Sequence, residues 1–255
     1  MAPRPHLPSR IARRIDARRT RAFLDLIGPA TRAFVERHGL QVRHGPLRGM
    51  FYLPGLESTS GDLVAKLLGA YEAELHPVLE QWVAAAPERI LDVGSAEGYY
   101  AVGLAHAIPG ATVYAYDIDR AARVRCAELA ALNEATDRVV IEGECTPQTL
   151  NDHPEAGVAL LSDCEGYERI LLDPVIAPRL ANWRILVELH EFLDAGITET
   201  LRGRFATTHH VEVIEGTVRD GGAYEELADV DARTRQALLS ENRPGAMRWM
   251  SLVPR

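Results

Sequence analysis

The feature that most constrains this 255-residue chain is an alternation of strand-like and helical segments that begins near residue 88. Short aliphatic runs with β-branched residues lie at 88–94, 113–119, 137–144, 158–166, 183–192, 209–218 and 246–254. Helical segments separate most of these runs, as at 98–108 and 120–134. Strands that alternate with helices are typical of a parallel sheet covered by helices on both faces. We therefore predict an α/β fold with a doubly wound, mostly parallel sheet of seven strands.

The first 86 residues do not share this alternation. Residues 9–39 have helical spacing with an expected break at Gly28-Pro29, and residues 58–86 are helical with a break near Gly69. Between them, LQVRHGPLRGMFYLP (40–54) predicts a small hairpin of two short strands. We therefore divide the chain into an N-terminal helical and hairpin extension at 1–86, which acts as a lid or dimer arm, and a main domain at 87–255.

The charge of the chain is unevenly distributed. The formal net charge is −8, yet the segment 1–48 is dense in arginine: Arg4, Arg10, Arg13, Arg14, Arg18, Arg19 and Arg21. A basic arm of this kind can bind nucleic acid. We expect no nucleic-acid partner, because no aromatic residues interleave these arginines and the acidic remainder of the chain repels phosphate. Instead of a nucleic-acid-binding arm, we expect an amphipathic helix whose arginines face water, or which packs on the acidic body of a homodimer.

Several classes of protein are excluded by what the sequence lacks. No apolar run approaches the roughly 20 residues that a membrane-spanning helix needs, and the basic N-terminus lacks the apolar segment of a secretory signal. The three cysteines, Cys126, Cys145 and Cys164, form no CxxC pair. We expect reduced thiols of a cytoplasmic protein, with neither a disulfide framework nor a zinc site.

Residues 90–100, ILDVGSAEGYY, place a glycine turn between a buried strand and a helix. In this position the backbone approaches a ligand closely, and the N–H groups of the helix point at it. The pattern is not GxGxxG, because the last glycine comes one position early and Ala96 occupies the middle site, so NAD is the weaker prediction. Asp92 places a negative charge where a dinucleotide has its phosphates. A cofactor with an ammonium or sulfonium group fits that charge better.

The next two strands also end in polar groups. The strand VYAYDID reaches Asp117, about 20 residues after the turn, where doubly wound sheets bind a ribose diol. The following strand ends in Gly143-Glu144-Cys145, at the position of an adenine edge. Asp117 alone could cap the helix that starts near Arg120. Three suitable strand ends at one edge of the sheet together predict a nucleoside cofactor.

The stretch from about Gly69 to Val253 resembles class I S-adenosylmethionine-dependent methyltransferases, and among them the FkbM-like family. Five segments carry this resemblance: LGAYEAEL (68–75), ILDVGSAEGYY (90–100), VYAYDID (113–119), LLSDCEGYE (160–168) and ILVELH (185–190). The chain departs from the family pattern at Ala96, Asp117 and Cys164. None of these departures removes a group that the cofactor needs. The resemblance also implies that the last strand of the sheet runs in the reverse direction.

The resemblance implies that S-adenosylmethionine lies along the carboxyl edge of the sheet. Its methionine moiety lies near Asp92 and Gly94, its ribose lies on Asp117, and its adenine lies at the end of the third strand. Tyr71 and Glu72 lie over the amino acid end. The implied cofactor-binding residues are Tyr71, Glu72, Asp92, Gly94, Ser95, Ala96, Gly98, Asp117, Ile118, Glu144, Cys145 and Asp163.

The ends of the fourth and fifth strands offer groups for the chemistry. Asp163 and Glu165 follow the fourth strand, and Glu188 and His190 share one face of the fifth. Methyl transfer from a sulfonium is an in-line displacement in which the enzyme positions the acceptor, and a base assists when the acceptor is a hydroxyl. We predict that His190 is this base, because its ordinary pKa lies near neutral pH, and that Asp163 and Glu188 assist it. The alternative for Asp163 and Glu165 is to cap the next helix.

A variant of this prediction adds a divalent metal. Asp163, Glu188 and His190 form a carboxylate-rich set that could hold Mg²⁺ and chelate a diol substrate. Oxygen ligands alone are the more usual choice for Mg²⁺. The histidine therefore speaks against this variant, and our prediction assigns no metal ligand.

We predict an enzyme that transfers a methyl group from S-adenosylmethionine to a hydroxyl of a small molecule, such as a sugar or secondary metabolite. Two alternatives stay open: an RNA methyltransferase that uses the arginine-rich arm, and an S-adenosylmethionine-binding module without catalytic activity. The acceptor has no motif of its own in the sequence, because fold identifies a cofactor far better than a substrate. We attribute the occurrence of a single lysine, Lys66, to codon usage.

Overall fold

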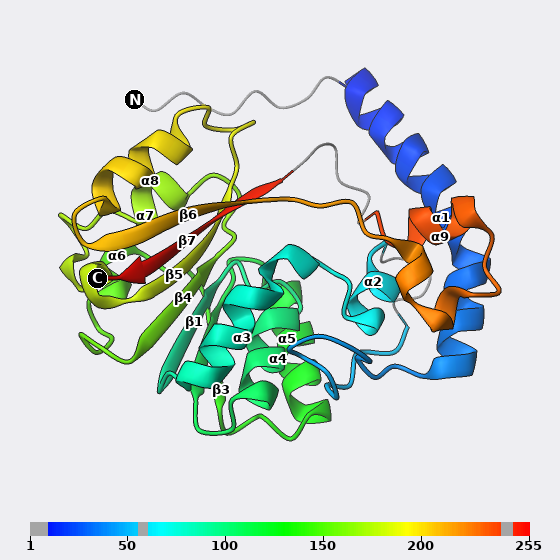
Figure 1. Cartoon of the computed structure of the whole chain (residues 1–255), viewed down its shortest axis with the longest axis horizontal. Coiled ribbons are helices and arrows are strands. Elements are labelled where there is room, and N and C mark those ends of the chain that lie inside the picture. Colours follow the sequence, from blue (N-terminus) through cyan, green and yellow to red (C-terminus); the bar gives the residue numbers. More distant parts are fainter. Residues whose placement is uncertain (1–9, 56–60, 241–246) are drawn as a thin grey trace.

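The chain forms one mixed β-sheet with helices on both faces (Figure 1). The computed structural model describes residues 10–55, 61–240 and 247–255, and for residues 10–19 it describes the backbone alone. The strands are β1 (Arg89–Val93), β2 (Thr112–Tyr116), β3 (Val139–Glu142), β4 (Val158–Ser162), β5 (Arg184–Leu189), β6 (His209–Glu215) and β7 (Arg248–Pro254). The α-helices are α1 (Arg10–His38), α2 (Leu63–Leu68), α3 (His76–Ala85), α4 (Tyr99–Ala107), α5 (Arg120–Leu132), α6 (Pro147–Leu150), α7 (Glu168–Leu171), α8 (Ile197–Phe205) and α9 (Ala232–Leu238). The short 3₁₀ helices are η1 (Ala73–Leu75), η2 (Pro178–Asn182), η3 (Gly221–Ala223) and η4 (Glu225–Leu227).

The strands of the described chain lie in the order β3-β2-β1-β4-β5-β7-β6. β1 to β5 are parallel, and β7 runs antiparallel to both β5 and β6. This arrangement confirms the predicted seven-stranded sheet and its reversed last strand. The strand order changes direction between β1 and β4, and open α/β sheets bind ligands beside such a point, at the carboxyl ends of the strands.

Apolar side chains form a core on each face of the sheet. On one face α3, α4 and α5 contribute residues such as Leu79, Val102 and Leu129. On the other face α7 and α8 contribute Leu171 and Leu201. The central strand β4 is buried along its whole length, as expected of a parallel strand that is covered on both sides. Because both faces are covered, the edge of the sheet is the place that a ligand can reach.

α1 is a single helix of 29 residues that continues through Gly28-Pro29, so the predicted break at these residues is wrong. A proline inside a helix removes one hydrogen bond and crowds the preceding turn, at a cost of about 3 kcal/mol. Ile27, Thr31 and Phe34 are buried at helical spacing around this proline. Their packing outweighs the local cost, because tertiary contacts of one face supply most of the stability of a helix in a protein.

Residues 40–54 form a loop of hairpin shape with one isolated bridge, between Gln41 and Phe51. The prediction of two short strands in this segment is therefore wrong. Gly45 and Gly49 both have left-handed backbones, with φ of 74° and 97°, so the chain turns where a ladder would otherwise extend. The predicted break near Gly69 is confirmed, because Gly69 ends α2 with φ of 71°, as glycine commonly does at a helix C-terminus.

The N-terminal extension packs on the segment between β6 and β7 (Figure 1). α1 contacts α9. Ion pairs join the two parts between Arg37 and Asp229 (2.8 Å), Arg43 and Glu226 (2.6 Å), and Arg219 and Glu74 (2.7 Å). The domain boundary at residue 86 and the role of the extension as a lid or dimer arm stay predictions. Within the described ranges, no helix has the length and apolarity needed to cross a membrane.

Candidate active site

The glycine turn joins β1 to α4 at the carboxyl edge of the sheet. Gly94 and Gly98 have left-handed backbones, with φ of 88° and 94°. A Cβ atom on Gly94 would lie 1.7 Å from the backbone oxygen of Asp163, and one on Gly98 would lie 2.7 Å from Cys126 Sγ. Both positions therefore need glycine, because the loop after β4 and helix α5 pass too close for a side chain.

Ala96 occupies the middle position of the turn and also has a left-handed backbone, with φ of 47°. Its N–H donates to Asp117 Oδ2 at 2.8 Å, and Asp117 Oδ1 accepts from the N–H of Asp119 at 2.7 Å. The Asp117 carboxylate thus ties the glycine turn to the loop after β2. Asp119 caps α5, by accepting from the N–H of Ala121. The alternative in which Asp117 caps this helix is therefore wrong.

A cavity of about 410 Å³ opens beside these two loops. It is lined by Val93, Gly94, Ala96, Tyr116, Asp117, Ile118, Gly143, Glu144, Cys145, Asp163, Cys164, Glu165 and Tyr167. These residues come from the carboxyl ends of β1, β2, β3 and β4 and the loops after them, and the volume suits a ligand of nucleoside size. Seven predicted cofactor-binding residues are among them: Gly94, Ala96, Asp117, Ile118, Glu144, Cys145 and Asp163. The other five, Tyr71, Glu72, Asp92, Ser95 and Gly98, do not line it.

Several buried polar atoms at this edge make no hydrogen bond within the described chain. They are Asp92 Oδ2, Ser95 Oγ, Asp163 Oδ1 and His190 Nε2. The last two form an ion pair with each other at 3.4 Å, whereas Asp92 Oδ2 and Ser95 Oγ have no such partner among the described residues. A buried polar atom without a partner is costly, and folded proteins usually complete such atoms with water or a ligand. The cleft therefore has the polar groups of a binding site in excess of what its own chain satisfies.

Asp92 lies under the turn and is 1% exposed. Burial raises its pKa to about 7, and the carboxylates of Asp117, Glu97 and Glu72 add to the shift against a backbone hydrogen bond at Ala101. Near neutral pH the group is therefore only partly ionised, and a cation beside it would complete the ionisation. A sulfonium or ammonium group of a cofactor fits this position, whereas a phosphate does not.

Glu72 follows α2 and is a buried acidic residue, 1% exposed. Its φ of 46° is left-handed, which is a strained conformation for a glutamate. Tyr100 Oη donates a hydrogen bond to Glu72 Oε2. The charge of Glu72 raises the pKa of both Asp92 and Asp163. This predicted cofactor residue therefore acts electrostatically on both the glycine turn and the acids after β4.

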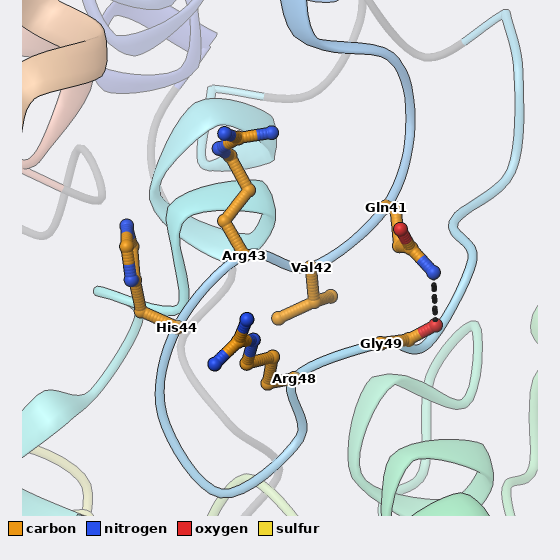
Figure 2. A pocket seen from close by; sticks show the side chains of 6 residues that line it. All are labelled: Gln41, Val42, Arg43, His44, Arg48 and Gly49. Atoms are coloured by element: carbon orange, nitrogen blue, oxygen red, sulfur yellow. Dashed lines mark hydrogen bonds between the residues drawn. The ribbon is translucent and has the colours of Figure 1, made fainter.

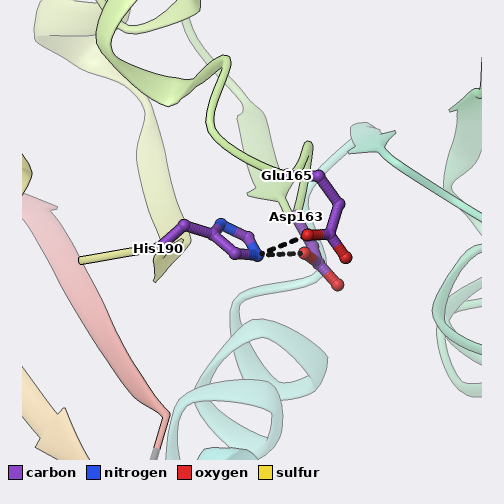
Figure 3. Close-up of side chains that lie close together, drawn as sticks. All are labelled: Asp163, Glu165 and His190. Carbon is purple, nitrogen blue, oxygen red and sulfur yellow. Dashed lines mark ion pairs between the residues drawn. The ribbon is translucent and has the colours of Figure 1, made fainter. Parts of the chain in front are cut away.

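His190, the first residue after β5, lies among four carboxylates, two of which are drawn in Figure 3. Its Nδ1 lies 2.7 Å from Glu168 Oε1. Its Nε2 lies 3.2 Å from Glu188 Oε2, 3.4 Å from Asp163 Oδ1 and 3.5 Å from Glu165 Oε2. Figure 3 shows the imidazole pointing toward the carboxylates of Asp163 and Glu165. The fold therefore brings the three predicted catalytic residues, His190, Asp163 and Glu188, into one cluster.

The charge state of this cluster differs from the expected one. Burial opposes a charged imidazole, but the hydrogen bond with Glu168 and the charge of Glu188 more than offset it and raise the pKa of His190 to about 10. At neutral pH the ring therefore carries protons on both nitrogens, which argues against His190 as a base in the ligand-free protein. Burial and Glu188 raise the pKa of Asp163 well above its ordinary value. A raised pKa favours the protonated carboxyl group, so in the ligand-free protein Asp163 becomes a proton acceptor only where a nearby positive charge stabilises its ionised form.

Glu168 is the residue of this site to which sequence reasoning gave no role. It is 1% exposed. Its Oε1 accepts hydrogen bonds from the N–H groups of Cys164 and Gly166, at 3.3 Å each, and also lies 2.7 Å from His190 Nδ1. No side-chain cap is present on α7, so Asp163 and Glu165 do not serve as the caps considered above. The available signal was the position of Glu168 in DCEGYE, one helical turn beyond the strand-end acids.

The cysteines at the cavity are not reactive groups. Burial raises the pKa of Cys145 to about 12 and raises that of Cys164 as well. A thiol that stays protonated is a poor nucleophile. All three cysteines of the chain are free, so the predicted absence of a disulfide framework agrees with the structure.

A second cavity, of about 450 Å³, lies at the hairpin-shaped loop of the extension (Figure 2). Its lining residues are Gln41, Val42, Arg43, His44, Arg48 and Gly49. Arg43 and His44 both pair with Glu226, at 2.6 and 2.9 Å. These basic groups hold the loop on the segment after β6, and we assign no ligand to this cavity.

The arginine-rich arm lies largely beyond what the structure describes. Arg4 lies outside the described residues, and so do the side chains of Arg10, Arg13, Arg14, Arg18 and Arg19. Arg21 is exposed and lies 4.0 Å from Asp25. The predicted absence of a nucleic-acid partner therefore stays a prediction.

No family model matches the chain, and no curated protein matches it. Among solved structures, the chain is similar to the O-methyltransferase TomG from Streptomyces achromogenes in complex with S-adenosylmethionine, with 16% identity over 76% of this chain and 87% of that chain and a TM-score of 0.47. It is similar to precorrin-6Y C5,15-methyltransferase from Geobacter metallireducens, with 12% identity over 69% and 87% and a TM-score of 0.47. It is also similar to cofactor-bound Rv0187 from MTB, with 14% identity over 88% and 88% and a TM-score of 0.45. These are likenesses of fold, and the FkbM-like resemblance stays a prediction.

Proposed function

We propose that the protein is an S-adenosylmethionine-dependent methyltransferase that acts on a hydroxyl group of a small molecule, such as a sugar or secondary metabolite. One observation carries this proposal: among the described residues, the cavity at the sheet edge is lined by four carboxyl side chains, those of Asp117, Glu144, Asp163 and Glu165, and by no basic side chain. Nucleotides with phosphates are repelled by such a lining. A nucleoside that bears a sulfonium and an ammonium group is attracted to it.

In this proposal Asp117 would hold the ribose hydroxyls of the cofactor, and Glu144 would lie at its adenine. Asp92 supports the positive methionine end. S-adenosylmethionine would supply a methyl group on its sulfonium, which would pass to the acceptor oxygen as the bond to sulfur breaks and leave a neutral thioether. The positive charge of a bound S-adenosylmethionine would favour the ionised form of Asp163, whose carboxylate would then take the proton of the hydroxyl, while the charged His190 donates Nε2–H to orient the acceptor oxygen.

Cofactor binding is tested by calorimetry with S-adenosylhomocysteine, the demethylated product. We expect the wild-type protein to bind it and Asp117→Ala to bind it at least about tenfold more weakly, since a bidentate contact with the ribose is lost. Asp119→Ala is the matched control, because Asp119 caps α5 and does not line the cavity. A wild-type protein that is folded and releases no heat would contradict the proposal.

The catalytic role of His190 is tested by His190→Ala. We expect methyl transfer from labelled S-adenosylmethionine, measured on a panel of hydroxylated acceptors, to fall by about 10²-fold or more while affinity for S-adenosylhomocysteine is kept. His210→Ala, which changes an exposed histidine on β6, should leave transfer unchanged. Turnover of the His190 variant within a factor of two of wild type would remove His190 from the mechanism.

A second form of the proposal includes a divalent metal at the same cluster. One ligand atom from each of Asp163, Glu165 and His190 lies within 4.8 Å of the others, so Glu165 replaces the Glu188 of the predicted set. Glu168 on the opposite ring nitrogen matches the carboxylate that orients a metal-bound histidine in many metalloproteins. A bound ion would polarise the acceptor hydroxyl and lower its pKa. Titration with Mn²⁺, followed by electron paramagnetic resonance in wild type and His190→Ala, tests this form, and activity insensitive to EDTA would remove it.

A further inference from the structure

Lys66, the only lysine in the chain, is buried in the otherwise apolar helix α2. Its Nζ lies 2.8 Å from Asp62 Oδ2 and 2.6 Å from Glu97 Oε1. A buried ammonium group is strongly unfavourable unless it is paired in this way. Asp62 belongs to the extension and directly precedes α2, whereas Glu97 belongs to the glycine turn. One buried charge therefore joins the extension to the turn.

Three tyrosine rings surround the same ammonium group. Its Nζ lies 4.8 Å from the ring centroid of Tyr71, 5.5 Å from that of Tyr99 and 5.9 Å from that of Tyr52. Such distances allow cation–π attraction. Tyr52 Oη also donates to Glu97 Oε1, the oxygen that Lys66 contacts. The rings come from the hairpin-shaped loop, the segment after α2 and the start of α4, so Lys66 lies where three parts of the chain meet.

The resemblance implies a cofactor role for both segments that Lys66 connects, and in the structure Gly94 and Ala96 of the glycine turn line the cavity, whereas Tyr71 and Glu72 do not. Tyr71 and Glu72, placed over the amino acid end, follow Lys66 after a sharp turn at Gly69. That turn has no room to adjust, because a Cβ atom on Gly69 would lie 2.1 Å from the backbone oxygen of His44. Glu97 lies between the two turn glycines, and its charge contributes to the raised pKa of Asp92. Loss of Lys66 would therefore loosen both segments and leave Glu97 without its cationic partner, next to the turn residues Gly94 and Ala96 that line the cavity.

We propose that Lys66 is a positioning residue for S-adenosylmethionine: its ion pair with Glu97 holds the N-terminal extension on the glycine turn in the geometry that binds the cofactor. This role rests on the proposed function, since the ligand is the proposed cofactor. Lys66 itself does not line the cavity. It acts by preorganising residues that do the binding, which raises affinity because the ligand no longer has to order them.

The test measures the Kd for S-adenosylhomocysteine by calorimetry and the melting temperature of each variant. We expect Lys66→Met to raise Kd about tenfold or more, and Lys66→Arg to stay within about threefold of wild type. The double variant Lys66→Met/Glu97→Gln removes the unpaired carboxylate, so it should recover melting temperature but not affinity. Arg204→Met is the matched control, because Arg204 is a partly buried cation that pairs with Asp173 on the α7–α8 side of the sheet.

Two results would overturn the role of Lys66 alone. One is a normal Kd in Lys66→Met with a lowered melting temperature, which is the signature of a merely structural residue. The other is a double variant that regains both melting temperature and affinity. If Lys66→Met does not fold, Glu97→Gln breaks the same link while Lys66 keeps Asp62, and it must then raise Kd by itself. A folded wild-type protein that binds no S-adenosylhomocysteine would instead overturn the proposed function on which this role rests.

Discussion

Strained residues of this chain gather around the candidate site. Among the described residues, the non-glycine positions with positive φ are Glu72, Ala86, Ala96, Glu134 and Glu165. Ala86 ends α3, and Glu134 lies two residues beyond α5, so these two terminate helices in the ordinary way. Ala96 and Glu165 line the cavity instead, and Glu72 lies near enough for its charge to raise the pKa of Asp92 and Asp163. A left-handed conformation costs an ordinary residue about 1 kcal/mol or more, and strain that is kept at one place is typical of functional sites.

Ala96→Gly should stabilise the protein. The side chain of Ala96 is exposed and its φ is 47°, so glycine loses no packing and relieves the left-handed strain. We expect the free energy of unfolding, measured with urea, to rise by about 0.5–1 kcal/mol after the entropy cost of glycine is included. Ala101→Gly, in the buried interior of α4, should lower it. An unchanged or lower free energy for Ala96→Gly would show that the turn is relaxed.

The raised pKa of Asp92 predicts how cofactor affinity depends on pH. Burial raises this pKa to about 7 in the ligand-free protein, and the ammonium group at the amino acid end of the ligand favours the ionised form of Asp92. Affinity for S-adenosylhomocysteine should therefore be level above pH 7 and should weaken about tenfold for each pH unit below it. Asp92→Asn should bind more weakly and lose this dependence. Adenosine, which lacks the methionine end, serves as the control ligand, and an equal pH dependence for adenosine would exclude Asp92 as the cause.

At the scale of helices and strands, the sequence predicts the sheet better than the extension. All seven predicted strands form, because aliphatic β-branched runs have few alternatives in a sheet that is buried on both faces. The structure of the extension is harder to predict, because the local helix-breaking and turn residues of its sequence compete with long-range packing. Gly28-Pro29 would end an isolated helix, and only the burial of Ile27 and Phe34 against the rest of the fold keeps α1 continuous.

The same limit applies to the candidate site. Strand ends identify Asp117, Glu144, Asp163 and His190, because the carboxyl ends of parallel strands share one edge. The charge of His190 does not follow from its own segment, since it depends on Glu168 and Glu188 around the ring. Lys66 is likewise an isolated charge in an apolar helix until the fold places Glu97 beside it.

Over the whole molecule, charges join segments that lie far apart in the sequence. Glu226, between β6 and β7, accepts hydrogen bonds from Arg43 and pairs with His44 of the extension, more than 180 residues earlier. Burial alone would raise the pKa of Glu226, but these two partners more than offset it and lower the pKa to about 2. A folded-state pKa below the ordinary value of 4.5 means that the contact stabilises the protein above pH 4.5. That contribution is lost as the pH falls toward 2.

Glu226→Gln should therefore destabilise the protein in a pH-dependent way. At pH 7 we expect the free energy of unfolding to fall by about 1.5–3 kcal/mol, the usual range for a hydrogen bond to a charged group. The difference from wild type should shrink between pH 4.5 and pH 3. Over this range Glu226 of the unfolded chain takes up a proton, whereas Glu226 of the folded protein stays ionised until about pH 2. Glu225→Gln, the exposed neighbour, should change little at any pH. Urea unfolding at several pH values measures both variants. If the free energy difference between Glu226→Gln and wild type stayed constant down to pH 3, packing and not this charge would hold the extension on the main domain.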